Sequence, residues 1–168
     1  MLREIQSCDN PFIYCDVVRK IQKRNPDKTY SVIGMDIPLS LDYEHDMILY
    51  QNITPVTGIF LKRELLNIIG YFDTTLKRYE DHDLNIRASL HHPLKHIPVP
   101  GSWFTWRNDS EGTSMSSTPD NLFTIQLPII YERYWKYAKD QVRVCSIMNQ
   151  ILQSRGLQPM FTFNEAKQ

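Results

Sequence analysis

Short apolar segments alternate with helix-like segments over the first two-thirds of the chain, and this alternation most limits the folds open to it. Residues 12–18 and 57–61 are short and apolar, with β-branched or aromatic side chains, as expected of buried strands. Residues 62–69 and 79–91 have apolar side chains at helical spacing. The first of these helices should bury Leu65, Leu66, Ile68 and Ile69 and end at Gly70. Residues 96–99 form another strand-like segment, so the alternation predicts an α/β layered domain.

Turn and cap residues mark further boundaries. The tripeptide at 25–27, Asn-Pro-Asp, is a turn signal before the strand-like residues 30–33, which predicts a hairpin. The C-terminal region 118–155 is predicted to be helical, and Pro128 should kink or divide it because proline removes a helical hydrogen bond. Gly156 is the expected cap of the last helix.

The composition excludes several classes of protein. A length of 168 residues fits one domain, and 42% hydrophobic with 23% charged residues excludes a disordered tail. Lysine and arginine (19) balance aspartate and glutamate (19), which argues against a dedicated nucleic-acid binder. Three scattered cysteines without a C-x-x-C pair argue against structural zinc and predict reduced thiols in a cytoplasmic protein. Neither a secretory signal nor a membrane-spanning segment is expected.

Three carboxylates lie at the start of the helix expected at 79–91. Glu80, Asp81 and Asp83 would interact favourably there with the positive end of the helix dipole. Arg87 follows Asp83 by four residues and is placed to pair with it. Taken alone, the pattern is also explained by ordinary structural acids in a first helical turn.

The order of the surrounding segments is more specific. The strand at 57–61 is followed by the basic pair Lys62-Arg63, a helix, and the turn Gly-Tyr-Phe-Asp at 70–73. The pattern Glu-Asp-His-Asp-Leu-Asn-Ile-Arg then covers residues 80–87. This order resembles the C-terminal half of family-2 glycosyltransferases of the inverting GT-A type. The resemblance is clearest over residues 50–116.

The resemblance implies a fold and a division of the chain. The expected fold class is α/β, a partial GT-A fold (the Rossmann-like nucleotide-diphospho-sugar transferase fold) with a mixed sheet and C-terminal helices. Residues 1–117 would form the acceptor-side half of the GT-A domain, and residues 118–168 a C-terminal helical extension. The nucleotide-binding half that such enzymes begin with, ending in a metal-binding Asp-x-Asp sequence, is not found in the sequence.

The resemblance also assigns roles to residues of the acid-rich segment. Inverting transfer needs a carboxylate that takes the proton from the acceptor hydroxyl as that hydroxyl attacks the anomeric carbon. The family pattern gives this role to Asp81. Glu80 would shape the acceptor pocket or raise the basicity of Asp81 through like-charge proximity. Gly58, at the strand before the basic pair, is counted among the substrate-binding residues.

A second segment, 102–116, looks like the family's loop after the last core strand, which folds over the donor diphosphate. Trp106, Arg107 and Ser114 would bind substrate there, and the planar guanidinium of Arg107 suits a phosphate. Many family members have a histidine shortly after this arginine, whereas Asn108 and Asp109 follow here. The alternative is a surface loop with two tryptophans packed on the core.

No metal ligands are expected in this chain. The tripeptide Asp81-His82-Asp83 spells Asp-x-Asp, but adjacent helical positions point in different directions and cannot all face one ion. Asp16 resembles a residue of the strand after the metal-binding sequence, so it is not interpreted as a ligand. The resemblance implies a divalent cation, Mn²⁺ or Mg²⁺, for the complete enzyme only.

Two functional hypotheses follow. The first is a truncated glycosyltransferase of cell-surface polysaccharide biosynthesis, with a nucleotide-sugar donor and a glycan or lipid-linked acceptor. It would be cytoplasmic, with a peripheral position at the inner membrane face as an option. The second is a catalytically inactive GT-A-like interaction domain that lacks the donor-binding half and pairs with another chain through an exposed sheet edge. Four aromatic residues of the C-terminal helices fit either a membrane surface or ordinary core packing: Tyr131, Tyr134, Trp135 and Tyr137.

Overall fold

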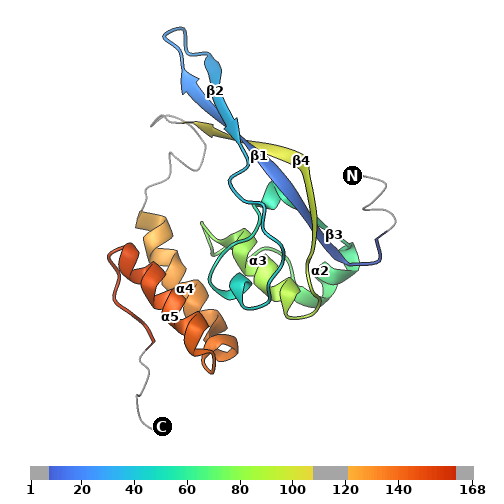
Figure 1. Ribbon diagram of the computed structural model, residues 1–168, viewed down its shortest axis with the longest axis vertical. Coiled ribbons are helices and arrows are strands. Elements are labelled where there is room, and N and C mark those ends of the chain that lie inside the picture. The colour runs from blue at the N-terminus through green and yellow to red at the C-terminus, as the bar shows by residue number, and fades with distance from the viewer. Residues whose placement is uncertain (1–7, 108–120, 162–168) are drawn as a thin grey trace.

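A mixed four-stranded sheet is built around one long strand, as Figure 1 shows for the computed structural model, which describes residues 8–107 and 121–161. The central strand β1 (Phe12–Arg24) pairs antiparallel with β2 (Tyr30–Asp36) and β3 (Ile59–Leu61). It pairs in parallel with β4 (Lys95–Arg107). Strand β4 occupies one edge of β1 along most of its length. Strands β2 and β3 therefore both lie on the other edge of β1, at its two ends. The α/β expectation and the mixed sheet are confirmed.

The predicted hairpin is present, but its strands are longer than expected. The first strand, expected to end at residue 18, continues to Arg24 and is paired with β2 from Arg19 onward. The apolar pattern stops at that point because the end of β1 extends beyond the helices (Figure 1). Beyond residue 18, β1 keeps its hydrogen bonds to β2 and β4 although its side chains are no longer buried in the core.

The expectation that residues 102–107 form a loop was wrong. These residues belong to β4, and Trp106 and Arg107 stand opposite Ile21 and Gln22 of β1. The prolines at 98 and 100, which cannot donate ladder hydrogen bonds, fall where the register between β1 and β4 is irregular. The strand therefore resumes after them instead of ending.

The two helices of the central region are confirmed, with one wrong burial assignment. Helix α2 (Arg63–Ile69) follows the 3-10 turn η2 (Val56–Gly58) and β3, and Gly70 ends it with a positive φ of 82°. Its residues Leu65 and Ile69 are buried, whereas Ile68 is 61% exposed, so α2 covers the core with a narrower stripe than predicted. Helix α3 (Glu80–Ser89) lies against another 3-10 turn, η1 (Met47–Leu49).

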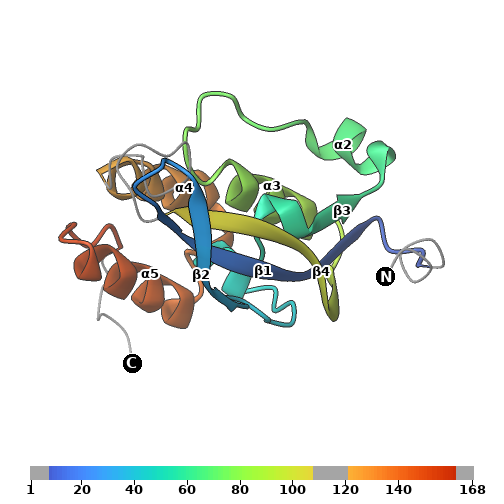
Figure 2. The same ribbon diagram turned by 90° about the horizontal axis from the view of Figure 1, so that it is seen from above.

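The C-terminal region consists of α4 (Asn121–Ala138) and α5 (Val142–Ser154), which lie beside one another at one end of the molecule (Figure 2). Of the two effects expected of Pro128, a division of the helix is contradicted, because α4 runs through this residue, and a kink stays a prediction. Buried residues on both sides of Pro128, Leu127 and Ile130, hold the helix against the core and offset the lost hydrogen bond. The left-handed Gly156 follows α5, as predicted.

One core joins the sheet to all these helices. Phe12 and Tyr14 of β1 and Leu84 of α3 belong to the same buried cluster as residues of α4 and α5. Tyr131 and Tyr134 are buried in it and Trp135 packs against it, which confirms the core-packing interpretation for these three, whereas Tyr137 is 39% exposed. The boundary expected between residues 117 and 118 lies outside the described residues and stays a prediction.

Two further findings concern the cysteines and the lengths of the helices. Cys15 and Cys145 are buried and Cys8 is half-buried, all three as free thiols. Within the described ranges, every helix is too short or too polar to cross a bilayer.

Candidate functional site

The start of α3 has an unusual backbone. Tyr79, directly before the helix, has left-handed dihedral angles (φ 63°, ψ 15°), which cost a non-glycine residue roughly 1 kcal/mol or more. Its hydroxyl oxygen accepts a hydrogen bond from Arg155 at 3.1 Å, and its ring lies against the His82 ring with centroids 6.2 Å apart. The turn delivers Glu80 and Asp81 into the first turn of α3, where a strained residue commonly marks a functional position.

Asp81 is a half-buried carboxylate with few compensating partners. Burial, and then the neighbouring charge of Glu80, raise the pKa of Asp81 to about 6. The His82 backbone N–H donates to Asp81 Oδ1 at 2.8 Å, and the Asn52 side chain also hydrogen-bonds this carboxylate. These two bonds favour the charged form but do not cancel the cost of burial. The group is therefore ionised at pH 7 and a stronger base than an ordinary aspartate.

A polar cluster that the sequence interpretation missed surrounds this carboxylate. The fully buried Asn85 donates to Asn52 Oδ1 at 2.8 Å and to the Thr54 carbonyl oxygen at 3.5 Å. Its own Oδ1 is buried and has no partner within the described part of the chain. We call Asn52, Thr54, Asp81 and Asn85 the Asp81 cluster. Asn52 and Thr54 are polar interruptions in the apolar run before the strand at 57–61, and this was the signal available in the sequence.

Gly58 lies directly beside the Asp81 cluster. A β-carbon at this position would come within 2.6 Å of both Thr54 Oγ1 and Val17 Cγ2. The structure thus brings three sequence-predicted residues, Gly58, Glu80 and Asp81, to one region. Close packing against Thr54 and Val17 also explains the glycine at position 58 without any role in binding substrate.

Substitution of Gly58 tests this packing. Gly58→Ala is expected to lower the free energy of unfolding by about 1–3 kcal/mol, because the added methyl group overlaps Thr54 and Val17. Chemical denaturation measures the change. Gly34→Ala is the matched control, since its added β-carbon meets only Ile21, at 3.6 Å or more. Equal stability of the two variants would contradict the tight approach at Gly58.

Asp83 faces away from Asp81 and has a structural environment. It is fully buried and accepts hydrogen bonds from Arg87 at 2.9 Å, Arg133 at 2.7 Å and the Tyr134 hydroxyl at 2.7 Å. The predicted pairing of Asp83 with Arg87 is confirmed. Arg133 also pairs with Asp73 at 2.9 Å, so this network ties the turn at residue 73, α3 and α4 together.

The side chains of the Asp-His-Asp tripeptide diverge, as expected. His82 Nε2 lies 2.7 Å from the Ile48 carbonyl oxygen, and burial lowers the pKa of His82 to about 4, so this ring is neutral. Asp16 Oδ1 contacts His96 Nε2 at 2.9 Å, on the sheet between β1 and β4. Over residues 8–107 and 121–161, no group of three or more His, Cys, Asp or Glu side chains is arranged to hold a metal ion. The divalent cation that the resemblance implies for the complete enzyme has no such site among these residues and stays a prediction.

Trp106 and Arg107 have their described contacts elsewhere, with the hairpin. The Arg19 guanidinium lies 5.9 Å from the Trp106 ring, and the Arg107 guanidinium lies 4.3 Å from the Tyr30 ring. Arg107 Nε is also 3.4 Å from Gln22 Oε1. Ser114 lies outside the described residues. The predicted donor-side residues are thus not joined to the Asp81 cluster by any contact described here.

Comparison with known proteins adds one relationship. No protein-family model matches the chain, and no solved structure matches it. The chain is 27% identical over 115 residues to the "Uncharacterized glycosyltransferase YwdF" of Bacillus subtilis (strain 168). This similarity supports a relationship to glycosyltransferases. The match covers 68% of this chain but only 41% of the relative, so the chain spans well under half of the relative's length.

Proposed function

We propose that this chain is the acceptor-side half of an inverting glycosyltransferase that uses a nucleotide-diphospho-sugar donor, and that Asp81 is its catalytic base. The observation that carries the proposal is the half-buried Asp81 carboxylate, whose pKa is raised to about 6 by desolvation and by the charge of Glu80. The glycosyltransferase relationship of the matched region supports the reaction class. Family 2, the inverting outcome and the nucleotide donor rest on the sequence resemblance.

The proposed step is a single displacement. Asp81 takes the proton of the acceptor hydroxyl while the acceptor oxygen forms a bond to the anomeric carbon of the sugar. The bond from that carbon to the diphosphate oxygen breaks, and the nucleoside diphosphate leaves with the electron pair. A base with a pKa nearer to the working pH takes the proton more effectively than an ordinary aspartate, whose pKa is about 3.9.

The surrounding residues have supporting roles in this proposal. Glu80 contributes a second negative charge, which keeps Asp81 basic, and it forms part of the acceptor pocket. Asn52 holds the carboxylate orientation through its hydrogen bond to Asp81 and is itself held by Asn85. Trp106, Arg107 and Ser114 are proposed to contact the donor, and a divalent cation, Mn²⁺ or Mg²⁺, to bind in the donor half of the complete enzyme. A glycan or lipid-linked molecule is the proposed acceptor.

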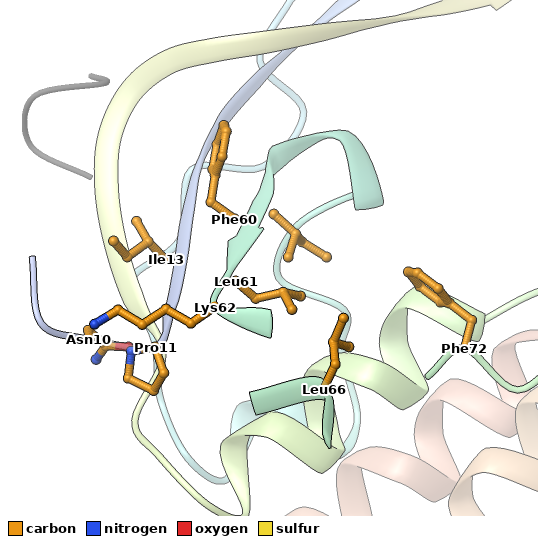
Figure 3. Close-up of a pocket in the computed structure, with 9 residues that line it drawn as sticks. Asn10, Pro11, Ile13, Phe60, Leu61, Lys62, Leu66 and Phe72 are labelled. Atoms are coloured by element: carbon orange, nitrogen blue, oxygen red, sulfur yellow. The ribbon is translucent and has the colours of Figure 1, made fainter. Parts of the chain in front are cut away.

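A second candidate, an interaction domain without activity, is supported by an open apolar groove of about 550 Å³ beside β3 (Figure 3). Phe60 and Phe72 lie at different ends of the groove in Figure 3, with Leu61 and Leu66 between them. No strand among the described residues pairs with the outer edge of β3. Such an edge offers backbone N–H and C=O groups to another polypeptide. That polypeptide is the donor half under the first proposal and a different protein under the second.

Nucleotide-sugar binding and transfer distinguish the two candidates. Alone, with Mn²⁺ present, this chain is expected to bind UDP-, GDP- and dTDP-sugars weakly or not at all. When it is joined to the nucleotide-binding part of a family-2 glycosyltransferase, release of nucleoside diphosphate should depend on an acceptor. Tight metal-dependent binding of a UDP-sugar by the chain alone would contradict the half-enzyme proposal. A joined protein that binds donor but transfers to no acceptor would favour the interaction domain.

A further inference from the structure

The hairpin of β1 and β2 is positively charged within a chain of no net charge. Residues 19–36 include five lysines and arginines against two aspartates, while the whole chain has 19 of each sign. Asp36 forms an ion pair with Arg19, and Asp27 accepts a hydrogen bond from the Thr29 backbone N–H at the hairpin turn. The hairpin extends away from the helices, at the top of Figure 1. The charge excess is therefore displayed on a projecting element.

Strand register places apolar and basic side chains on one face of this hairpin. Directly opposed residues share a face, as do alternate residues along a strand. The register pairs Lys20 with Met35, and the bulge after it pairs Gln22 with Val32, so Met35 and Val32 share the face of Lys20. The parallel neighbour β4 extends this face. We call the following residues the hairpin face: Lys20, Arg24, Tyr30, Val32, Met35, Trp103 and Arg107.

Three large apolar side chains of the hairpin face are exposed to solvent, at positions where polar side chains would be expected on a soluble protein. Met35 is 62%, Trp103 63% and Val32 46% exposed. The Lys20 ammonium lies 4.2 Å from the Trp103 ring, and the Arg107 guanidinium stacks over Tyr30. Clustered exposed apolar side chains of this kind mark a surface that contacts another apolar phase or molecule.

We infer that the hairpin face binds the surface of an anionic phospholipid bilayer. Trp103 and Tyr30 have the amphipathic rings that favour the headgroup level, and Val32 and Met35 provide apolar groups for the acyl boundary. Lys20, Arg24 and Arg107 provide positive charge for lipid phosphates. A nucleic acid would use the cations and rings, but it offers no partner for the exposed aliphatic groups. The inference goes beyond the proposed function and does not depend on it.

Vesicle sedimentation with the full chain tests the inference. Binding should be strong to vesicles of phosphatidylcholine with one-third phosphatidylglycerol, weak to phosphatidylcholine alone, and reduced by added salt. Lys20→Glu and Arg24→Glu should each lower the affinity at least about fivefold. Val32→Ser combined with Met35→Ser should also lower it severalfold, because the apolar contact is removed.

Controls and a second measurement keep the result independent of folding defects. Val142→Ser, at an apolar residue 64% exposed on α5, and Lys139→Glu should bind as the unaltered chain does. In the unaltered chain, brominated lipid should quench tryptophan fluorescence, and Trp103→Phe should remove most of that quenching. Equal binding to both vesicle types, or hairpin variants that bind like the controls, would overturn the inference. The inference would also be overturned if the chain bound an oligonucleotide more tightly than the anionic vesicles, and if Val32→Ser with Met35→Ser left that binding unchanged.

Discussion

Asp81→Asn is expected to lower sugar transfer by a factor of about 10²–10⁴ in the joined enzyme and, at the same time, to stabilise the fold near pH 7. The loss of transfer follows because the amide cannot take the acceptor proton. The gain in stability follows because burial and Glu80 raise the pKa of Asp81 to about 6, so the folded state holds a disfavoured charge. A residue present only for packing would not show both effects.

The pH dependence fixes the sign of the stability effect. With a folded pKa of about 6 and an unfolded pKa of about 3.9, Asp81 favours folding below pH 4. That contribution is lost as the pH rises through 6, with an upper limit of about 3 kcal/mol for a shift of about two units. Asp81→Asn should therefore raise the free energy of unfolding by about 1–3 kcal/mol at pH 7 and by little at pH 4.

Chemical denaturation of this chain between pH 4 and pH 8 measures that difference without any assay of activity. The exposed Asp140→Asn is the control and should change the unfolding free energy by less than about 0.5 kcal/mol. An Asp81→Asn variant that matches the unaltered chain in stability at every pH, and retains transfer in the joined enzyme, would remove Asp81 from the proposed role.

Asp83→Ala is expected to have the largest effect on stability, a loss of about 3–5 kcal/mol. Asp83 is fully buried, and its removal leaves the charged groups of Arg87 and Arg133 and the Tyr134 hydroxyl without their shared acceptor. A loss of this size is a large part of the stability of a typical domain. Denaturant titration or thermal unfolding measures it.

The matched control is Asp36→Ala, which removes an aspartate paired with Arg19 on the exposed hairpin. An exposed pair of this kind contributes about 0–1 kcal/mol. If Asp83→Ala costs no more than Asp36→Ala, the buried network does not hold α3 and α4 together as described.

Local sequence signals predicted the elements better than their lengths. The caps at Gly70 and Gly156 and the turn at 25–27 were correct because these depend on a few adjacent residues. The end of β1 was missed because residues 19–24 are polar, and the pairing that keeps them extended comes from segments distant in the chain. The division of the helix at Pro128 was wrongly predicted for a similar reason, since the packing of α4 on the core is not visible in the sequence.

The candidate site shows the same division between local and distant information. Asp81 and Glu80 were found from a contiguous pattern, and the structure places Gly58 near them. Asn52, Asn85 and Arg133 were not found, because their importance depends on contacts across 33 to 50 positions of sequence. The proposed donor-side residues remain predictions, and for Trp106 and Arg107 the described neighbours are hairpin residues.

The shared acceptor Asp83 has a consequence for folding cooperativity. Two of its donors, Arg133 and Tyr134, come from α4, whereas Asp83 itself and Arg87 come from α3. A chain cut before α4 would bury a carboxylate that has lost these two donors, along with the apolar contacts of the common core. Neither segment is therefore expected to melt alone, and the described residues should unfold in a single transition.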